Sequence, residues 1–315
     1  MKIRIATRKS RLALWQSEHV AGLLRRKFPG IEVELLPMST RGDEILDRPL
    51  AEIGGKGLFL KELEKALIDG RADLAVHSLK DVPAESPAGL ELKSFLPRAD
   101  AGDLWIALNR VAPIGLPAGS VVGSSSLRRI SQLRAIRPDL EVVALRGNVE
   151  TRLAAVADRR VDATILAAAG LRRLGIVPAH ARELPIDDWL PAPGQGVIAV
   201  QARSDDSGAE ELLAALDCPQ TRAQTLAERG VVKVLGGDCR MPLAAYAAID
   251  GAMMTLRTRL GDEQGVLIQA EVQGPVESAA ELGRQAAEIL LDSGGRELLA
   301  RLNMSAPEVA PKKNI

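Results

Sequence analysis

The chain has 315 residues, of which 46% are apolar, and its 41 basic residues balance its 41 acidic ones. These values describe an ordinary globular protein that is too long for one typical core and suits two or three domains. The zero net charge excludes the global basic field of a protein that binds nucleic acid or acidic membranes, and the scarcity of aromatic residues argues against base stacking.

The N-terminal segment and the number of cysteines indicate the cellular compartment of the protein. The start "MKIRIATRKS" reads as a strand and lacks the apolar region of a signal peptide. No stretch approaches about 18 uninterrupted apolar residues, so we expect no membrane span. Two cysteines without an export signal indicate the cytoplasm and reduced thiols, and the three histidines lack metal-ligand spacing with a cysteine. We therefore expect a cytoplasmic protein with no disulfide and no metal site, and the absence of a long apolar face favours a monomer.

The first 200 residues alternate between strand and helix patterns. The predicted elements are a strand over 3–7, a helix over 10–28 with Ser10 as its N-cap, a strand over 31–38, a helix over 57–70 and a strand over 73–78. This alternation predicts an α/β architecture with largely parallel strand pairing.

A weak internal repeat suggests two similar modules. The segment 68–82 resembles 157–171, and the segment 6–20 resembles 123–136. Two α/β modules that face each other form a cleft, and such clefts bind ligands. The chain is expected to cross between the modules at 97–103 and again at 190–196, which would make a hinge.

The pattern changes after about residue 218. A predicted helix is followed by three predicted strands and a long helix, over 221–237, 242–249, 252–260, 265–274 and 276–295. Sequential strands flanked by helices predict a small α+β domain with an antiparallel sheet. Cys239 lies at the entrance of this domain, in "GGDCRMP".

Arginines gather where predicted strands end and helices begin. They are Arg8, Arg11, Arg128, Arg129, Arg146, Arg152, Arg172 and Arg173. These turns are where open α/β sheets bind ligands, helix N-termini attract anions, and guanidinium groups match carboxylate or phosphate. The clustering predicts a site for a multiply anionic small molecule. Solvated arginines paired with nearby acidic residues are the plainer alternative.

Three further segments could carry chemistry. Asp81 follows the strand that ends in "HSLKDVP", where it could act as acid, base or cation stabiliser, or simply begin a turn. The glycine-rich "GGKGLF" holds Lys56 without Walker A spacing, so it could be a lid, an anion-cradling turn or the start of a helix. Gln195 in "PGQG" could be a hinge or a contact residue.

The residues around Cys239 do not by themselves decide its role. Arg240 and a nearby helix end could give its thiol some thiolate character. No Cys-His-Asn arrangement supports a protease nucleophile, so an inert loop thiol remains equally open. Cys218 reads as a small structural or linker residue.

Eight segments together resemble one family. In chain order they are "RIATRKSRLALWQ", "GGKGLF", "DLAVHSLKDVP", "GSSSLRR", "LRGNVETRL", "AAAGLRRLG", "LPAPGQG" and "GDCRMP". Each motif alone is weak, but the ordered set closely resembles the porphobilinogen deaminase (hydroxymethylbilane synthase) family from residue 3 to beyond residue 290. One departure is Asp238, directly before Cys239.

The resemblance implies an α/β fold with two lobes like those of type II periplasmic binding proteins and a small α+β C-terminal domain with a three-stranded antiparallel sheet. The implied domains are lobe 1 over 1–97 plus 196–217, lobe 2 over 102–191 and the C-terminal cofactor-attachment domain over 219–315. It also implies a transferase of tetrapyrrole (haem or chlorophyll-type) biosynthesis. Such an enzyme condenses four porphobilinogen molecules head to tail into 1-hydroxymethylbilane with release of ammonia.

The resemblance also implies roles for single residues. A dipyrromethane cofactor would be held by a thioether to Cys239, and Asp81 would be the catalytic residue. The implied cofactor- and substrate-binding residues are Arg8, Ser10, Lys56, Phe59, Ser78, Lys80, Ser125, Ser126, Arg128, Arg129, Arg146, Gly147, Asn148, Arg152, Arg173 and Gln195. Of these, Lys56 and Phe59 would belong to a lid. The competing hypothesis is a non-catalytic two-lobed protein that binds a polyanionic small molecule. In that case the cysteine-bearing third domain would have no purpose.

Overall fold

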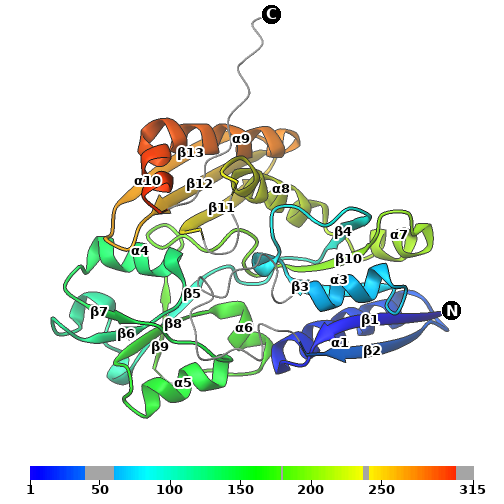
Figure 1. The fold of residues 1–315 in the computed structure, drawn as a ribbon, viewed down its shortest axis with the longest axis horizontal. Coiled ribbons are helices and arrows are strands. Elements are labelled where there is room, and N and C mark those ends of the chain that lie inside the picture. The colour runs from blue at the N-terminus through cyan, green and yellow to red at the C-terminus, as the bar shows by residue number, and fades with distance from the viewer. Residues whose placement is uncertain (40–59, 179, 237–240, 303–315) are drawn as a thin grey trace, which may run out of the picture.

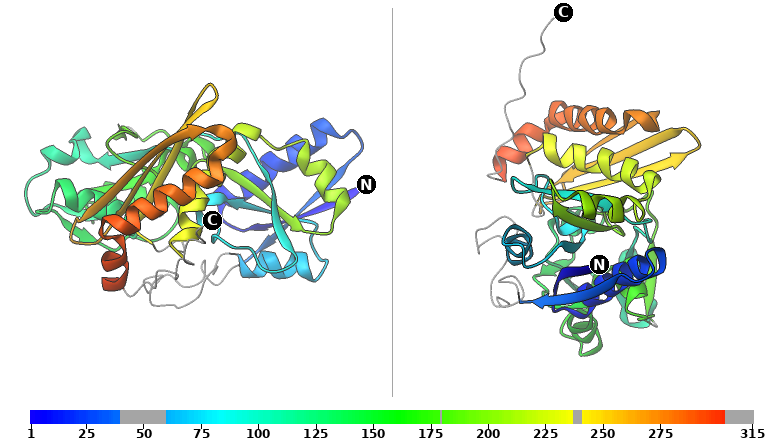
Figure 2. Two further views of the ribbon diagram at one scale, coloured as in Figure 1. Left: turned by 90° about the horizontal axis from the view of Figure 1, so that it is seen from above. Right: turned by 90° about the vertical axis from the view of Figure 1, so that its right-hand side faces the viewer.

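The computed structural model describes residues 1–39, 60–178, 180–236 and 241–302. Within these ranges the chain forms three sheets, each with its own helices (Figure 1). The first two units lie side by side, and the C-terminal unit lies across them (Figures 1 and 2). We name the three units lobe 1, lobe 2 and the C-terminal domain, and their junction is the centre of the molecule.

Lobe 1 is built on a five-stranded sheet of order β2-β1-β3-β10-β4. Its strands are β1 (Lys2–Arg8), β2 (Glu32–Met38), β3 (Leu74–Ser78), β4 (Leu90–Phe95) and β10 (Ile198–Arg203). Its helices are α1 (Arg11–Lys27), α3 (Lys61–Ile68) and α7 (Ser207–Ala214). Successive residues of β1 face opposite sides of the sheet: Ile5 packs with α1 and α7, and Ala6 packs with α3. Both helical layers are therefore fixed by one strand.

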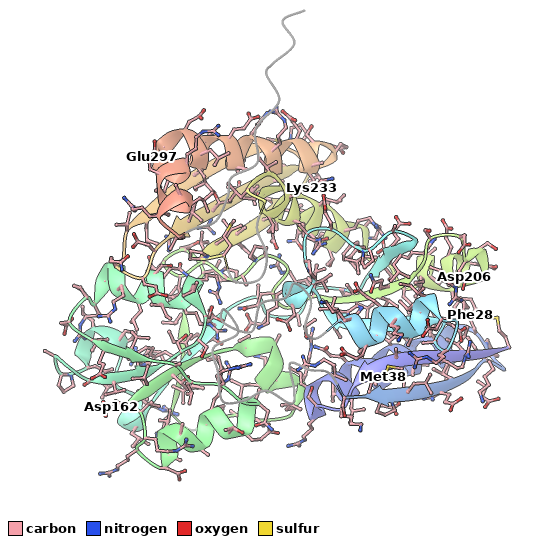
Figure 3. All side chains as sticks on the ribbon, in the orientation of Figure 1. Phe28, Met38, Asp162, Asp206, Lys233 and Glu297 are labelled. Atoms are coloured by element: carbon pink, nitrogen blue, oxygen red, sulfur yellow. The ribbon has the colours of Figure 1, made fainter. Side chains whose placement is uncertain are left out.

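Capping residues set where α1 and α7 of lobe 1 begin. The Ala13 N–H donates to the Oγ of Ser10 at 3.3 Å, so the predicted N-cap of α1 is confirmed. The Ala209 N–H donates to Asp206 at 2.9 Å in the same way at the start of α7. Asp206 lies at the outer edge of the molecule, as does Asp162 on the opposite side (Figure 3). The Asp162 carboxylate accepts from the Val121 N–H at 2.7 Å and fixes a loop of lobe 2.

Lobe 2 is built on a second five-stranded sheet, of order β7-β6-β8-β5-β9. Its strands are β5 (Asp103–Ala107), β6 (Val121–Gly123), β7 (Glu141–Val143), β8 (Ala163–Ala167) and β9 (Ala181–Leu184). Its helices are α4 (Leu127–Ile136), α5 (Val149–Ala157) and α6 (Ala168–Arg173), with short 3₁₀ turns at Leu108–Arg110 and Pro113–Gly115. Trp105 is fully buried at the heart of its core.

The prediction of largely parallel pairing in the first 200 residues is wrong, because the sheet of each lobe is mixed. β10 runs antiparallel to β3 and β4, and β5 runs antiparallel to β8 and β9. These are the first strands after each passage of the chain between lobes. Asp103 at the start of β5 pairs with Ala167 at the end of β8, and Ile198 at the start of β10 pairs with Ser78 at the end of β3. A strand that enters from the cleft begins where its parallel neighbours end, so it must run the opposite way.

The C-terminal domain has the predicted three-stranded antiparallel sheet, of order β11-β12-β13. Its strands are β11 (Leu243–Asp250), β12 (Met253–Gly261) and β13 (Leu267–Pro275), and its helices are α8 (Pro219–Val234), α9 (Ala279–Leu290) and α10 (Arg296–Arg301). Helices α8 and α9 approach closely at Gly230 and Gly283. A Cβ on Gly283 would lie 2.4 Å from the carbonyl oxygen of Ala227. Only glycine allows this packing.

The long helix predicted over 276–295 is shorter than expected. Residues Val276–Ser278 form a 3₁₀ turn, α9 ends at Leu290, and a kink with non-helical backbone at Ser293 and Gly294 leads into α10. Gly294 has a φ of 103°, a conformation that interrupts a right-handed helix. The Gly-Gly pair therefore bends the chain within the domain, and the helix resumes beyond it.

The expected fold class is confirmed: two α/β lobes and a small domain with a three-stranded antiparallel sheet. The domain boundaries given above stay predictions. Across the described ranges, no helix combines the length and the apolar character needed to cross a membrane.

Candidate functional site

Two pockets share Val82, and one of them lies at the junction of the three units. The central pocket is lined by residues of lobe 1, lobe 2 and the C-terminal domain: Leu79, Lys80, Val82, Pro83, Ala84, Ser126, Leu127, Arg128, Ala192, Pro193, Arg229, Val232, Met241 and Leu243. The lobe 1 pocket is lined by Arg8, Ser10, Leu12, Ala13, Gln16, Leu60, Val76, His77, Ser78, Asp81 and Val82. Both pockets adjoin the turn that follows β3.

That turn is a single 3₁₀ turn, Leu79–Asp81. Leu79 is buried, and the next two residues face different pockets: Lys80 lines the central pocket and Asp81 lines the lobe 1 pocket. Consecutive residues of a 3₁₀ helix point about 120° apart, which explains the divergence. The turn thus offers an ammonium group to one pocket and a carboxylate to the other.

Lys80 has a perturbed ionisation. Burial lowers its pKa to about 8. Asp81 and Asp103 oppose this change, whereas Arg128 and Arg129 add to it. Lys80 therefore changes between its charged and neutral forms slightly above neutral pH. Other cations, such as Arg128, line the same pocket.

The lobe 1 pocket gathers predicted residues from three segments. Arg8 ends β1, Ser10 caps α1, and Ser78 ends β3, with Asp81 just beyond it. Gln16 was missed by the sequence analysis. It is buried on α1, and its Nε2 donates to Ser78 Oγ at 2.8 Å. A polar residue among the buried positions of α1, which include Val20 and Leu24, was the available signal.

His77 also lines this pocket, and it is neutral. Its Nε2 lies 3.0 Å from Oε1 of Gln201 within the sheet. Burial lowers its pKa to about 4, with the positive charge of Arg8 acting in the same direction. The ring is thus a buried polar support below the pocket.

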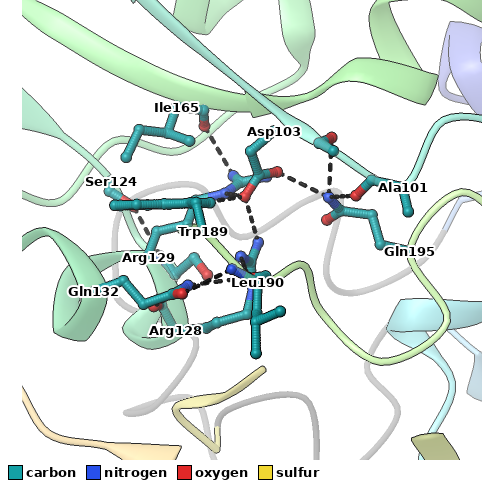
Figure 4. Close-up of polar contacts among 12 residues, drawn as sticks. Ala101, Asp103, Ser124, Arg128, Arg129, Gln132, Ile165, Trp189, Leu190 and Gln195 are labelled. Carbon is teal, nitrogen blue, oxygen red and sulfur yellow. Dashed lines mark hydrogen bonds and ion pairs between the residues drawn. The ribbon is translucent and has the colours of Figure 1, made fainter. Parts of the chain in front are cut away.

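Arg128 and Arg129 lie in the first turn of α4 and share one carboxylate, that of Asp103 (Figure 4). Arg129 contacts Asp103 through Nη2 at 2.7 Å and Nε at 3.1 Å, and Arg128 contacts it through Nη2 at 2.9 Å. All three side chains are buried. The two predicted binding residues are therefore already ion-paired, and sequence analysis missed the residue that pairs them.

Asp103 is held ionised by its neighbours. Burial alone would raise its pKa, but the charges of Arg128 and Arg129 outweigh that effect and hold the pKa well below its usual range. The Nε2 of Gln195 also donates to Asp103 at 2.9 Å. Gln195 is buried in the second crossing segment, with its Oε1 lacking a partner among the described residues.

Ser125 and Ser126 precede α4. Ser126 occupies the N-cap position and lines the central pocket. Ser125 is exposed, and its Oγ donates to the carbonyl of Leu145 at 3.1 Å. Of the two predicted serines, only Ser126 lines a pocket.

The loop before α5 carries a second group of predicted residues. Asn148 caps α5 by accepting from the Thr151 N–H at 2.8 Å. Gly147 has a φ of 104°, and a Cβ there would lie 2.8 Å from the Thr151 side chain, so glycine is required. The Gly147 carbonyl accepts from Nε of Arg152 at 3.0 Å.

Arg152 ties this loop electrostatically to the pockets. Burial lowers its pKa to about 10, the charges of Arg129 and Arg146 act in the same direction, and Asp81 opposes them. Because such charge effects need short distances, the lobe 2 arginines and the lobe 1 carboxylate belong to one electrostatic cluster.

Arg173 links the two lobes. Its Nη2 donates to the carbonyl of Gly196 at 2.7 Å, and its guanidinium lies over the ring of Trp15, 6.0 Å from the centroid. Burial lowers its pKa to about 10. Arg11 on α1 and Glu150 on α5 make a second bridge between the lobes, at 3.0 Å.

The crossing segments are fixed by Glu228, another residue that the sequence analysis missed. This fully buried carboxylate on α8 pairs with Arg98 at 2.5 Å and accepts from the Gly194 N–H at 2.7 Å and the Ala247 N–H at 2.9 Å. It therefore joins both crossing segments to the C-terminal domain. The polar row Thr221, Gln224, Thr225 and Glu228 on the buried side of α8 was the signal in the sequence.

Three predicted residues, Lys56, Phe59 and Cys239, lie outside the described residues. Met241, two positions after Cys239, lines the central pocket. The chain that carries the cysteine therefore returns to the described structure at that pocket.

Comparisons with known proteins place the chain in a family. The family model "Porphobilinogen deaminase, dipyromethane cofactor binding domain" matches residues 3–211, and "Porphobilinogen deaminase, C-terminal domain" matches residues 223–292. Porphobilinogen deaminase of Xanthomonas campestris pv. campestris is 52% identical over 95% of this chain and 99% of that protein. The enzyme of Chromobacterium violaceum is 50% identical over 95% of this chain and 97% of that protein.

Among solved structures, the VFT2 domain of BvgS from Bordetella pertussis is similar to 68% of this chain and to 86% of that chain. Its sequence identity is 17% and its TM-score is 0.41. That similarity is too low to bear on function. The two family models and the relatives, which align with almost the whole sequence, decide the matter: the chain belongs to the porphobilinogen deaminase family.

Proposed function

We propose that the two pockets carry out the reaction of the family and that Asp81 is its catalytic carboxylate. In this reaction four porphobilinogen molecules condense head to tail into 1-hydroxymethylbilane, with release of ammonia. The observation that carries the proposal is the position of Asp81. Its half-buried carboxylate lines a pocket beside Arg8 and Ser10, within electrostatic reach of Arg152 from the other lobe.

The surrounding cations suit a growing polyanion. Each porphobilinogen carries two carboxylates, so every added unit increases the negative charge of the chain. Guanidinium forks, hydroxyl groups and helix N-termini bind carboxylates well. The proposed contact residues are Arg8, Ser10, Ser78, Lys80, Ser125, Ser126, Arg128, Arg129, Arg146, Gly147, Asn148, Arg152, Arg173 and Gln195. Lys56 and Phe59 would cover the substrate from their glycine-rich segment.

Asp81 would act on charge that develops in the reaction. Loss of ammonia from porphobilinogen leaves an azafulvene cation, and an adjacent carboxylate stabilises that cation and accepts hydrogen bonds from pyrrole N–H groups. The same carboxylate can take the proton that leaves when the new carbon–carbon bond forms. Neutral His77 beneath the pocket adds no competing positive charge.

The central pocket fits a dipyrromethane held on Cys239. Apolar side chains such as Leu79, Val232 and Leu243 suit flat pyrrole rings, and Lys80 and Arg128 can receive their carboxylates. The Nε of the buried Arg128 has no hydrogen-bond partner in the described chain, which is rare for a buried polar group. When bound, the group supplies the free pyrrole position to which the first substrate unit is joined.

We also propose a cytoplasmic monomer with the three domains bounded as in the sequence analysis. The zero net charge supports the absence of nucleic-acid and membrane partners. Porphobilinogen is then the only small-molecule partner that the proposal requires.

The test is direct assay of the purified chain with porphobilinogen. We expect consumption of the substrate, formation of 1-hydroxymethylbilane and release of four ammonia molecules per product. A chain that binds porphobilinogen without releasing ammonia would instead be the non-catalytic two-lobed binding protein. That outcome would refute the proposed function.

A further inference from the structure

We propose that Asp103 is a positioning residue for this reaction: it fixes the Arg128–Arg129 pair at the central pocket. The inference rests on the proposed function. It concerns a residue that does not line either pocket and therefore acts through others.

Asp103 is buried and surrounded by polar side chains that contact its carboxylate. Asp103 is the first residue of β5, directly after the first crossing segment, and is 1% exposed. Its two oxygens accept from four side chains (Figure 4). The donors are Nη2 of Arg129 at 2.7 Å, Nε of Arg129 at 3.1 Å, Nη2 of Arg128 at 2.9 Å, Nε2 of Gln195 at 2.9 Å and Nε1 of Trp189 at 3.1 Å.

The two arginines that share this carboxylate differ in how many of their nitrogens have a hydrogen-bond partner. Arg129 also donates from Nη1 to the carbonyl of Ile165 at 2.8 Å, so each of its three nitrogens has a partner. Arg128 donates from Nη1 to the carbonyl of Leu190 at 2.8 Å, and its Nε stays unpartnered among the described residues. Arg128 lines the central pocket. Asp103 thus holds Arg128 where its side chain lines the pocket.

The same carboxylate controls the charge balance of the pocket. Arg128 and Arg129 are adjacent and buried, so without Asp103 they would repel each other and lose their compensation. Asp103 also raises the pKa of Lys80, against the effect of both arginines. Its link to Gln195 connects this balance to the second crossing segment.

Three variants test the proposal. Asp103→Asn removes the charge at nearly constant shape, and Asp103→Glu keeps the charge but lengthens the side chain. Asp217→Asn is the matched control, because Asp217 pairs with Arg222 at 2.7 Å and accepts from the Phe95 N–H at 2.8 Å, and it does not line either pocket. For each protein we would measure kcat and KM against pH, the unfolding midpoint, and the pH dependence of Lys80 acylation by peptide mass spectrometry.

We expect Asp103→Asn to raise KM about tenfold, since a positioned charge-assisted contact is lost. The titration of Lys80 should move to lower pH, because a negative charge that raises its pKa is removed. Asp103→Glu should raise KM and leave the Lys80 titration in place. Asp217→Asn should lower the unfolding midpoint and change neither KM nor the titration.

A purely structural role gives a different pattern. If Asp103→Asn lowers the unfolding midpoint and leaves KM and the Lys80 titration at their wild-type values, the proposal is wrong. If Asp103→Asn does not fold, Asp103→Glu decides, and an unchanged KM in that variant contradicts a positioning role. Failure of the proposed function would be recognised separately, because the wild-type protein would then release no ammonia. The Lys80 titration would still test the role of Asp103 in that case.

Discussion

Lys80 and Asp81 are consecutive residues of one 3₁₀ turn, and they face different pockets. Lys80 lines the central pocket together with Arg128, and Asp81 lines the lobe 1 pocket together with Arg8. A single turn at the end of β3 therefore positions a carboxylate-binding group and a cation-stabilising group on the two sides of the junction.

Asp81→Ala should abolish turnover without unfolding the protein. The side chain is half-buried, so its removal leaves no large cavity, but the developing cation loses its carboxylate. We expect ammonia release to fall roughly 100- to 10,000-fold. The matched control is Glu85→Ala, four residues on and exposed, which should keep near-normal turnover. Near-normal ammonia release by Asp81→Ala would remove Asp81 from its proposed role.

Activity should fall as pH rises through the pKa of Lys80, about 8. The lysine must be protonated to bind a carboxylate, and above that pH its ammonium form is lost. Lys80→Arg should remove this limb of the kcat/KM profile, since arginine stays charged. A profile that keeps its alkaline limb in Lys80→Arg would assign the titration to another group.

The bridge between Arg11 and Glu150 should add little stability. Both side chains are substantially exposed, at 66% and 38%, although they join the two lobes. We expect a coupling free energy below about 1 kcal/mol in a double-mutant cycle of Arg11→Gln and Glu150→Gln. The coupling should vanish in about 1 M salt, where the screening length is about 3 Å. A coupling that persists in high salt would contradict this interpretation.

Glu228 should matter far more to stability. Glu228→Ala leaves the buried Arg98 guanidinium without its carboxylate and two backbone N–H groups without an acceptor. We expect the free energy of unfolding to fall by about 3–5 kcal/mol. The control is Glu281→Ala, which breaks an exposed pair with Arg284 and should cost less than about 1 kcal/mol. Similar losses in the two variants would show that Glu228 is not a structural junction.

Local signals in the sequence predicted local structure well. The Ser10 cap, the strand pattern of β1 and the three strands of the C-terminal domain follow from residues close in the chain, and all are confirmed. The direction of β5 and β10 was not predictable in this way, because it depends on how the chain passes between lobes. The bend at Gly294 was likewise missed, since the helix resumes after it.

The roles of the buried acidic residues Asp103 and Glu228 could not be predicted from the sequence. Asp103 gains its role from Arg129, which lies 26 residues away, and Glu228 gains its role from Arg98, which lies 130 residues away. Such pairings are fixed by the tertiary fold. Single arginines at strand ends could be identified from the sequence, but their partners could not.

The intact mass of the purified chain tests the central claim most directly. Protein expressed in a host that makes porphobilinogen should be heavier than its sequence by two linked pyrrole units, and peptide mapping should locate the excess on Cys239. Cys239→Ser prepared in parallel should have the bare chain mass. A wild-type protein with the bare mass, or with the excess on another residue, would contradict the account.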